Sequence, residues 1–310
     1  MRSLLPGRAP SYVVFALCLA ALGLAAPAGT ATAGADHRGV CVDERGQAAG
    51  RAKAGSPDHR DVVTSAQFPT QADAARLAPL AAGSVNIDTV FHVITDHALS
   101  NAETARYTRR IGRQMDVLNA AFAGMTAPDA ADTPFRFTLV ATTYTVNSGW
   151  ARMALGSNEE LAAKRALRQG GISTLNVYAA DPQELFGWAT YPGGREKDLF
   201  YDGVVIWENS MPGGTLPTNS RGDTANHEVG HWLGLLHTFD NGCTKKGDLV
   251  ADTAAERSPA AGCPTGRDTC RAPGLDPIHN FMDYSDDTCL NHFTPGQSQR
   301  MSDQWQEFRA

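Results

Sequence analysis

The stretch His-Glu-Val-Gly-His-Trp-Leu-Gly-Leu-Leu-His at residues 227–237 contains three histidines at the spacing that a single metal ion requires. A helix turns by about 100° per residue, so His227 and His231 lie one turn apart on the same face and can reach one ion. If the helix continued, His237 would point elsewhere. Gly234 is the residue that can take a positive φ and turn the chain back. The spacing therefore predicts a site formed by three imidazoles.

Three neutral imidazoles leave the fourth position of a tetrahedral metal to water, as in catalytic rather than structural zinc sites. Glu228 lies beside the histidines, and we expect it to act as a general base and not as a ligand. A short His-Glu-x-x-His pattern also occurs by chance. The extended pattern favours a functional site because it includes the glycine that the turn requires and lies on an amphipathic helix. Zinc is the favoured metal, although imidazoles also suit other divalent transition ions.

Bulk composition is that of an ordinary globular protein. The chain has 310 residues, of which 42% are hydrophobic and 19% are charged, and this leaves room for one large domain or two small ones. The net charge of −6 is not that of a protein with a basic surface for nucleic acid, so no nucleic-acid partner is expected.

The N-terminus has the pattern of a secretory signal peptide. Arg2 and Arg8 precede an apolar core at residues 12–26, which is followed by the small residues Ala-Thr-Ala at 31–33. A membrane anchor is the alternative, but this core is shorter than the roughly 20 residues that a spanning helix needs. We therefore expect residues 1–33 to be removed, and the protein to be secreted without a membrane attachment.

The rest of the chain divides into a pro-segment and a catalytic domain. Residues 34–83 are rich in Ala, Gly, Arg and Asp, which is typical of a weakly ordered pro-segment. Residues 84–310 show an α+β pattern, with a helix that starts at a capping box of Ser100 and Glu103. Alternating or apolar runs predict strands near residues 85–92, 135–145, 174–179 and 203–207. We expect the last of these strands to form the sheet edge beside the site, where an extended substrate would add as a strand.

The segment after the histidine motif is loop-like and contains most of the cysteines. Signal removal leaves five, of which four lie at positions 243, 263, 270 and 289. Four cysteines allow three connectivities, so spacing alone leaves the pairing open. The remaining histidines lack partners in the sequence, and we interpret them as structural: His92, His97, His279 and His292.

The run Asn-Phe-Met-Asp-Tyr-Ser at residues 280–285 follows the histidine motif and, together with it, resembles the Met-turn of the metzincin metallopeptidases. Within that clan the chain is similar to the pappalysin family. The similarity rests on the residues between and after the histidines, on the stretch 248–253, and on the run from 280 to 297. It is strong from about 224 to 297, and it is limited to the general pattern from 85 to 206.

The resemblance implies a metzincin-type zincin. In this fold a mixed twisted sheet and the active-site helix form an N-terminal subdomain, and an irregular, disulfide-bonded C-terminal subdomain ends in a helix. It also implies a secreted zinc endopeptidase that acts as a monomer on extracellular proteins or peptides. Two alternatives are a non-catalytic protein that keeps the scaffold only to bind a partner, and a thermolysin-like zinc hydrolase whose third ligand is a distant glutamate.

The resemblance also implies roles for particular residues. Met282 would form an apolar floor under the metal, and the phenol of Tyr284 would donate to the oxyanion formed during attack. The cysteines would pair as Cys243–Cys270 and Cys263–Cys289. Cys41, left in the pro-segment, would occupy the fourth zinc position as a latency switch, with a free or intermolecular thiol as the alternative.

The resemblance also implies a calcium site, and two acidic residues close to Cys289 are candidates for substrate specificity. Calcium would bind in the loop after the helix through Asp248, Asp252 and Thr253, which offer hard oxygen ligands. Asp286 and Asp287 would line the pocket for the residue after the scissile bond, and this implies a preference for a basic residue there.

Overall fold

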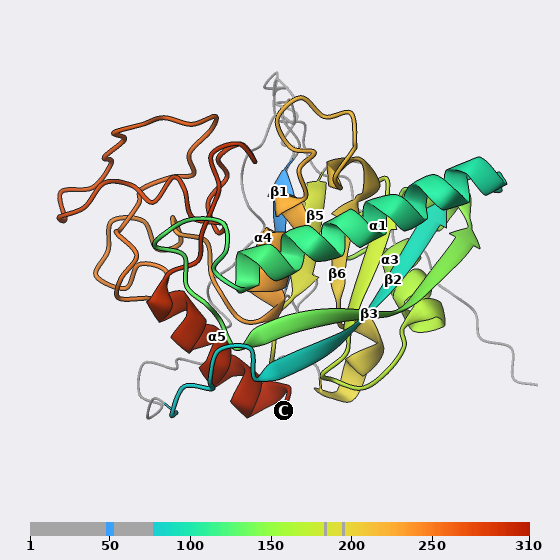
Figure 1. Ribbon diagram of the computed structural model, residues 1–310, viewed down its shortest axis with the longest axis horizontal. Coiled ribbons are helices and arrows are strands. Elements are labelled where there is room, and N and C mark those ends of the chain that lie inside the picture. Colours follow the sequence, from blue (N-terminus) through green and yellow to red (C-terminus); the bar gives the residue numbers. More distant parts are fainter. Residues whose placement is uncertain (1–47, 53–76, 183–184, 194–195) are drawn as a thin grey trace, which may run out of the picture. The chain divides into compact units, whose positions relative to one another are not determined.

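Figure 1 shows the computed structural model, which describes residues 48–52, 77–182, 185–193 and 196–310. The predicted signal peptide and Cys41 lie outside the described residues, as does most of the predicted pro-segment. Within the described part of the chain, no helix is both long and apolar enough to cross a bilayer.

One mixed sheet of six strands underlies the site. Its strands are β1 (Ala48–Ala52), β2 (Val85–Thr95), β3 (Phe135–Val146), β4 (Leu175–Ala180), β5 (Leu185–Thr190) and β6 (Val204–Trp207). They lie in the order β1-β5-β6-β4-β2-β3. β2, β3, β4 and β6 run parallel to one another, and β5 runs antiparallel to β6. The structure thus confirms the predicted mixed sheet and four of its strands.

The prediction that residues 203–207 form the sheet edge is wrong. β6 lies between β4 and β5 and pairs with both. Val204, Val205 and Ile206 are fully buried, because an unbroken apolar run suits a strand that is covered on both faces. The strand nearer the edge is β5, which the sequence did not predict. β1 pairs antiparallel with the side of β5 that faces away from β6, from Ala48 opposite Thr190 to Ala52 opposite Leu185.

Helices cover both faces of the sheet. α1 (Asn101–Phe122) begins at the predicted capping box, in which Ser100 and Glu103 exchange hydrogen bonds. Its buried stripe packs with α4 (Asp223–Trp232) in the larger core cluster, on one sheet face. The short helices α2 (Ser148–Ala151) and α3 (Asn158–Leu167) contribute to a second cluster. Val177 belongs to the first cluster and Tyr178 to the second, because successive side chains of a strand point to opposite faces.

Two short 3₁₀ helices flank β6, namely η3 (Glu196–Tyr201) and η4 (Glu208–Ser210). Beyond α4 the described chain has no helix or strand until α5 (Pro295–Phe308), which is drawn in red in Figure 1. Two disulfides crosslink this irregular region, Cys243–Cys270 and Cys263–Cys289, as the family resemblance implied. Arg267 adds a charged crosslink, because it forms ion pairs with the buried carboxylates of Glu256 and Asp276.

Candidate metal centre and active site

α4 and the turn after it bring the three histidines together. The helix ends after Trp232, and Gly234 follows with a φ of 95°. In this turn Leu235 N donates to Gly230 O at 2.9 Å, which closes the helix in the way that a left-handed glycine allows. A side chain at Gly234 would also collide with Gln304, since an added Cβ would lie 2.5 Å from its Cγ. The predicted role of Gly234 in turning the chain is confirmed.

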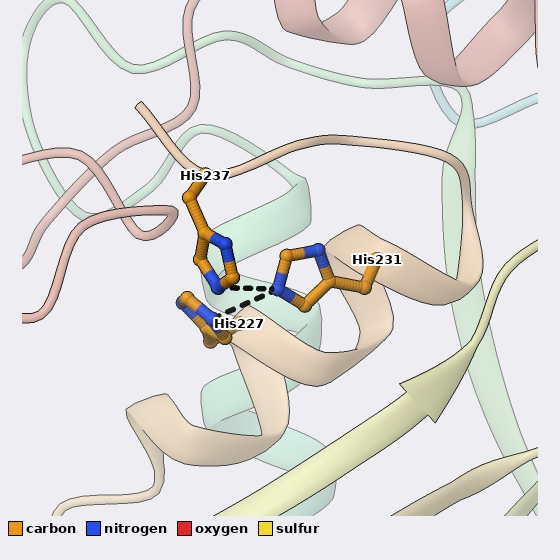
Figure 2. A group of neighbouring side chains, drawn as sticks. All are labelled: His227, His231 and His237. Atoms are coloured by element: carbon orange, nitrogen blue, oxygen red, sulfur yellow. Dashed lines mark hydrogen bonds between the residues drawn. The ribbon is translucent and has the colours of Figure 1, made fainter. Parts of the chain in front are cut away.

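The three imidazoles point toward one another (Figure 2) and are fully buried. Nε2 of His231 lies 3.0 Å from Nε2 of His227 and 3.1 Å from Nε2 of His237. A tetrahedral ion with bonds of about 2.0–2.1 Å holds its ligand atoms roughly 3.3 Å apart, so these nitrogens have nearly the spacing that zinc requires. These three side chains form a group whose ligand atoms are close enough together to hold a metal ion.

The outer nitrogens of two of the rings donate to backbone carbonyls, which directs their Nε2 atoms inward. Nδ1 of His227 donates to Phe281 O at 2.7 Å, and Nδ1 of His231 donates to Leu235 O at 2.8 Å. Nδ1 of His237 lies 3.6 Å from a carboxylate oxygen of Asp240. A proton on Nδ1 leaves the lone pair on Nε2, the tautomer that binds a metal.

Burial also keeps the central ring neutral. Desolvation, with a smaller contribution from nearby His237, holds the pKa of His231 well below its ordinary value. A neutral imidazole is the form that ligates a transition metal. The donor set, its spacing and its protonation therefore fit zinc.

Glu228 lies between the histidines and the sheet. It is fully buried and faces Gly187 of β5, where an added Cβ would lie 2.9 Å from Glu228 Cγ and 3.0 Å from its Oε1. The same Cβ would lie 2.7 Å from Val205 O. A glycine at this point of the strand therefore provides the space that the carboxylate occupies.

Tyr284 and Met282 approach the histidines from the segment that the Cys263–Cys289 disulfide encloses. The hydroxyl of Tyr284 lies 3.1 Å from Nε2 of His237, the nitrogen that faces the other two rings. Met282 is fully buried beneath α4, where Gly230 leaves room for its sulfur. Both residues therefore lie next to the helix and turn that hold the histidines.

The candidate calcium residues lie in two environments. Asp248 is buried, and its Oδ1 accepts from Thr253 Oγ1 at 2.6 Å. Desolvation raises the pKa of Asp248 to about 7. The oxygens of Asp252 instead accept from Thr294 Oγ1 and Gly296 N, each at 2.7 Å, at the start of α5. Asp252 therefore contacts the helix N-terminus, whereas Asp248 and Thr253 contact each other.

The remaining predicted residues have structural partners. Asp287 is buried and accepts from Arg221 N at 2.8 Å, whereas Asp286 is half-buried. His92 bonds to Thr143 and Asn176, and His279 donates to Cys289 O. These two histidines lie apart from the three-histidine group, in agreement with their structural interpretation.

Comparisons with known proteins identify the family. A family model described as Peptidase M43, pregnancy-associated plasma protein-A, matches residues 187–306. An extracellular metalloprotease of Sordaria macrospora is 44% identical over 237 residues, which cover 74% of this chain and 78% of the relative. The chain belongs to the pappalysin family. Extracellular metalloprotease 1 of Coccidioides posadasii is 42% identical to this pappalysin over 232 residues. The aligned region covers 73% of this chain and 79% of the relative.

Solved structures agree with this assignment. Mature mirolysin of Tannerella forsythia, in complex with a cleaved peptide, is 29% identical with a TM-score of 0.58, covering 70% of this chain and 90% of that chain. A promirolysin mutant of Tannerella forsythia is 25% identical with a TM-score of 0.62, and the match covers 73% of this chain and 82% of that chain. The metzincin-type fold is confirmed. This pappalysin is an extracellular metalloendopeptidase, and neither the non-catalytic nor the thermolysin-like alternative is supported.

Proposed function

We propose that the metal of this endopeptidase is zinc, held by His227, His231 and His237. The observation that carries the proposal is the convergence of three buried Nε2 atoms, with Nδ1 of His227 and of His231 bound to backbone carbonyls. When bound, zinc would polarise the scissile carbonyl and lower the pKa of water toward about 7.

Glu228 performs the proton transfers in this proposal. Its carboxylate takes a proton from the attacking water and later delivers it to the leaving amine. The phenol of Tyr284 donates to the oxyanion, and Met282 supports the helix that holds the ligands. The position of Glu228 supports this role, because it follows the ligand His227 directly on α4 and its carboxylate is held against Gly187 of β5.

The substrate chain extends along β5 rather than β6. In support, the outer side of β5 already pairs with an extended segment of the chain itself, β1, which also contacts α4. β1 falls within the proposed pro-segment, residues 34–83, so the segment covers the edge that a substrate would use. We place Cys41, outside the described residues, as the thiolate that occupies the fourth metal position in the zymogen.

The remaining inferences concern ions, specificity and assembly. Calcium would bind at Asp248 and Thr253, with Asp252 as the third candidate. Asp286 and Asp287 would favour a basic residue after the scissile bond, although Asp287 already accepts a backbone hydrogen bond. We expect a monomer that acts on proteins and peptides, with no nucleic-acid or membrane partner.

One set of variants tests the zinc site. Glu228→Gln should retain one zinc per chain, measured by elemental analysis, and lose casein cleavage by several orders of magnitude. His237→Ala should lose the metal, whereas His97→Ala, on the exposed surface, should keep both metal and activity. Stoichiometric zinc in His237→Ala, or substantial turnover by Glu228→Gln, would contradict the assignment.

A further inference from the structure

Tyr191, which no feature of the sequence singled out, touches one of the three histidines. It follows β5 directly and is 3% exposed. Its hydroxyl lies 2.9 Å from Nδ1 of His231, and the two ring centroids are 5.3 Å apart. The same Nδ1 lies 2.8 Å from Leu235 O.

The chemistry of the imidazole determines the direction of this hydrogen bond. A metal on Nε2 requires the proton of His231 on Nδ1, so Nδ1 is a donor with two acceptors, Leu235 O and the Tyr191 oxygen. Two acceptors fix the plane of the ring and favour the Nδ1–H tautomer. They also increase the electron density at Nε2, which makes it a better ligand.

The position of Tyr191 connects this hydrogen bond to the sheet. β5 and the residue that follows it both contact α4: Gly187 of β5 lies against Glu228, and Tyr191 lies against His231. The carbonyl of Leu235 belongs to the turn after α4 and moves with it. Tyr191 instead anchors the ring to a strand of the sheet, so it fixes the position of the ligand relative to β5.

We propose that Tyr191 is a positioning residue for the metal: its hydroxyl holds the His231 imidazole in the tautomer and plane that direct Nε2 to the ion. The inference rests on the proposed three-histidine zinc site. It adds a residue from a different element, 40 positions away in the chain, to the groups that determine metal affinity.

The test is Tyr191→Phe, which removes the hydroxyl and keeps the ring. The matched control is Tyr144→Phe. Tyr144 lies on β3, away from the histidines, and its hydroxyl lies 3.1 Å from Oγ1 of Thr108 on α1. Zinc affinity is measured by competition with a chromogenic chelator, and ligand geometry by the visible spectrum of the Co²⁺ form. Thermal unfolding of the metal-free proteins reports on the fold.

Loss of an outer partner of a metal ligand typically lowers affinity by about 10–100-fold. We expect a decrease of this size and an altered Co²⁺ spectrum in Tyr191→Phe, with unfolding of the metal-free protein close to that of Tyr144→Phe. Equal zinc affinity in the two variants would overturn the proposal, as would a metal-free Tyr191→Phe that no longer folds. If the unsubstituted protein binds no stoichiometric zinc, the proposed zinc site itself fails, which is a distinguishable result.

Discussion

The sulfur of Met282 packs against the backbone of Gly230, so closely that a Cβ added to Gly230 would lie 2.5 Å from Sδ. Gly230 lies between two of the three histidines, at a helix position where alanine would otherwise be favoured by about 1 kcal/mol. Met282 is fully buried and belongs to the larger core cluster, so its movement would disturb other buried side chains. The glycine inside the histidine motif is therefore explained by the methionine beneath it.

Gly230→Ala is expected to destabilise the protein and weaken metal binding. Overpacking a core costs about 1–3 kcal/mol, which exceeds the gain in helix propensity. The control is Gly112→Ala on the exposed side of α1, where an added Cβ meets nothing within 4 Å and should stabilise by about 0.5–1 kcal/mol. Urea unfolding of both variants gives the comparison, and a Gly230→Ala protein as stable as Gly112→Ala would contradict this account.

The histidine site was predictable from sequence because its parts are local. His227 and His231 are one helical turn apart, and Gly234 is needed for the turn that follows. Tyr191 was not predictable, since nothing in a lone Tyr after a short apolar run indicates a contact with a residue 40 positions later. Its hydrogen bond depends on the sheet order, which brings the end of β5 to α4.

The sheet edge was misassigned for a related reason. The run at 203–207 and the run at 185–190 are both short and apolar, and periodicity alone does not tell an edge strand from a buried one. Gly187 interrupts the second run and makes it a weak strand signal, although its lack of a side chain is what accommodates Glu228. The feature that hid β5 in the sequence is thus the feature that the site requires.

Asp248 is expected to make stability depend on both pH and calcium. Desolvation raises its folded-state pKa to about 7 from 3.8, so the native state binds the extra proton between these values. Without calcium, this group's contribution to the free energy of unfolding is full below about pH 4 and is lost as the pH rises to about 7, a decrease of a few kcal/mol. Asp248→Asn should remove this dependence, and the exposed Asp268→Asn should not.

A calcium ion at the proposed site would reverse the sign of this contribution, because a bound cation stabilises the ionised carboxylate. Added Ca²⁺ should therefore raise the melting temperature more at pH 8 than at pH 5, and Asp248→Asn should abolish the effect. Calorimetry at the two pH values, with Mg²⁺ as the comparison ion, measures both changes. A melting temperature that does not respond to Ca²⁺ at pH 8 would exclude a calcium site at Asp248.

Arg267 is expected to be essential for the irregular region after α4. It forms ion pairs with the fully buried carboxylates of Glu256 and Asp276, and burial together with nearby Asp283 already raises the pKa of Glu256. Arg267→Ala leaves these charges without their partner, at a cost of about 3–5 kcal/mol. Arg257→Ala should cost much less, because this exposed guanidinium donates to Thr269 O at 3.2 Å and faces solvent.

The loss in Arg267→Ala should become smaller as the pH falls. Below its raised pKa, Glu256 takes up a proton, and a neutral carboxyl no longer needs a cation. Chemical unfolding at pH 5 and pH 8 tests this expectation. A loss that is equal at both pH values would show that Arg267 acts through packing rather than through charge.

Tyr284→Phe is expected to lower kcat while leaving KM and zinc content nearly unchanged. The phenol lies 3.1 Å from Nε2 of His237, and in the proposed site that nitrogen gives its lone pair to the metal. In the proposed mechanism the hydroxyl donates instead to the oxyanion that would form beside the metal. Removal of one such donor typically costs about 10²–10³ in kcat. Steady-state kinetics on a fluorogenic peptide, with Tyr144→Phe as the control, measures this effect. If Tyr284 acted only through packing, Tyr284→Phe would have a lower melting temperature and would retain zinc less well. Loss of an oxyanion donor should instead lower turnover and leave both of these properties unchanged.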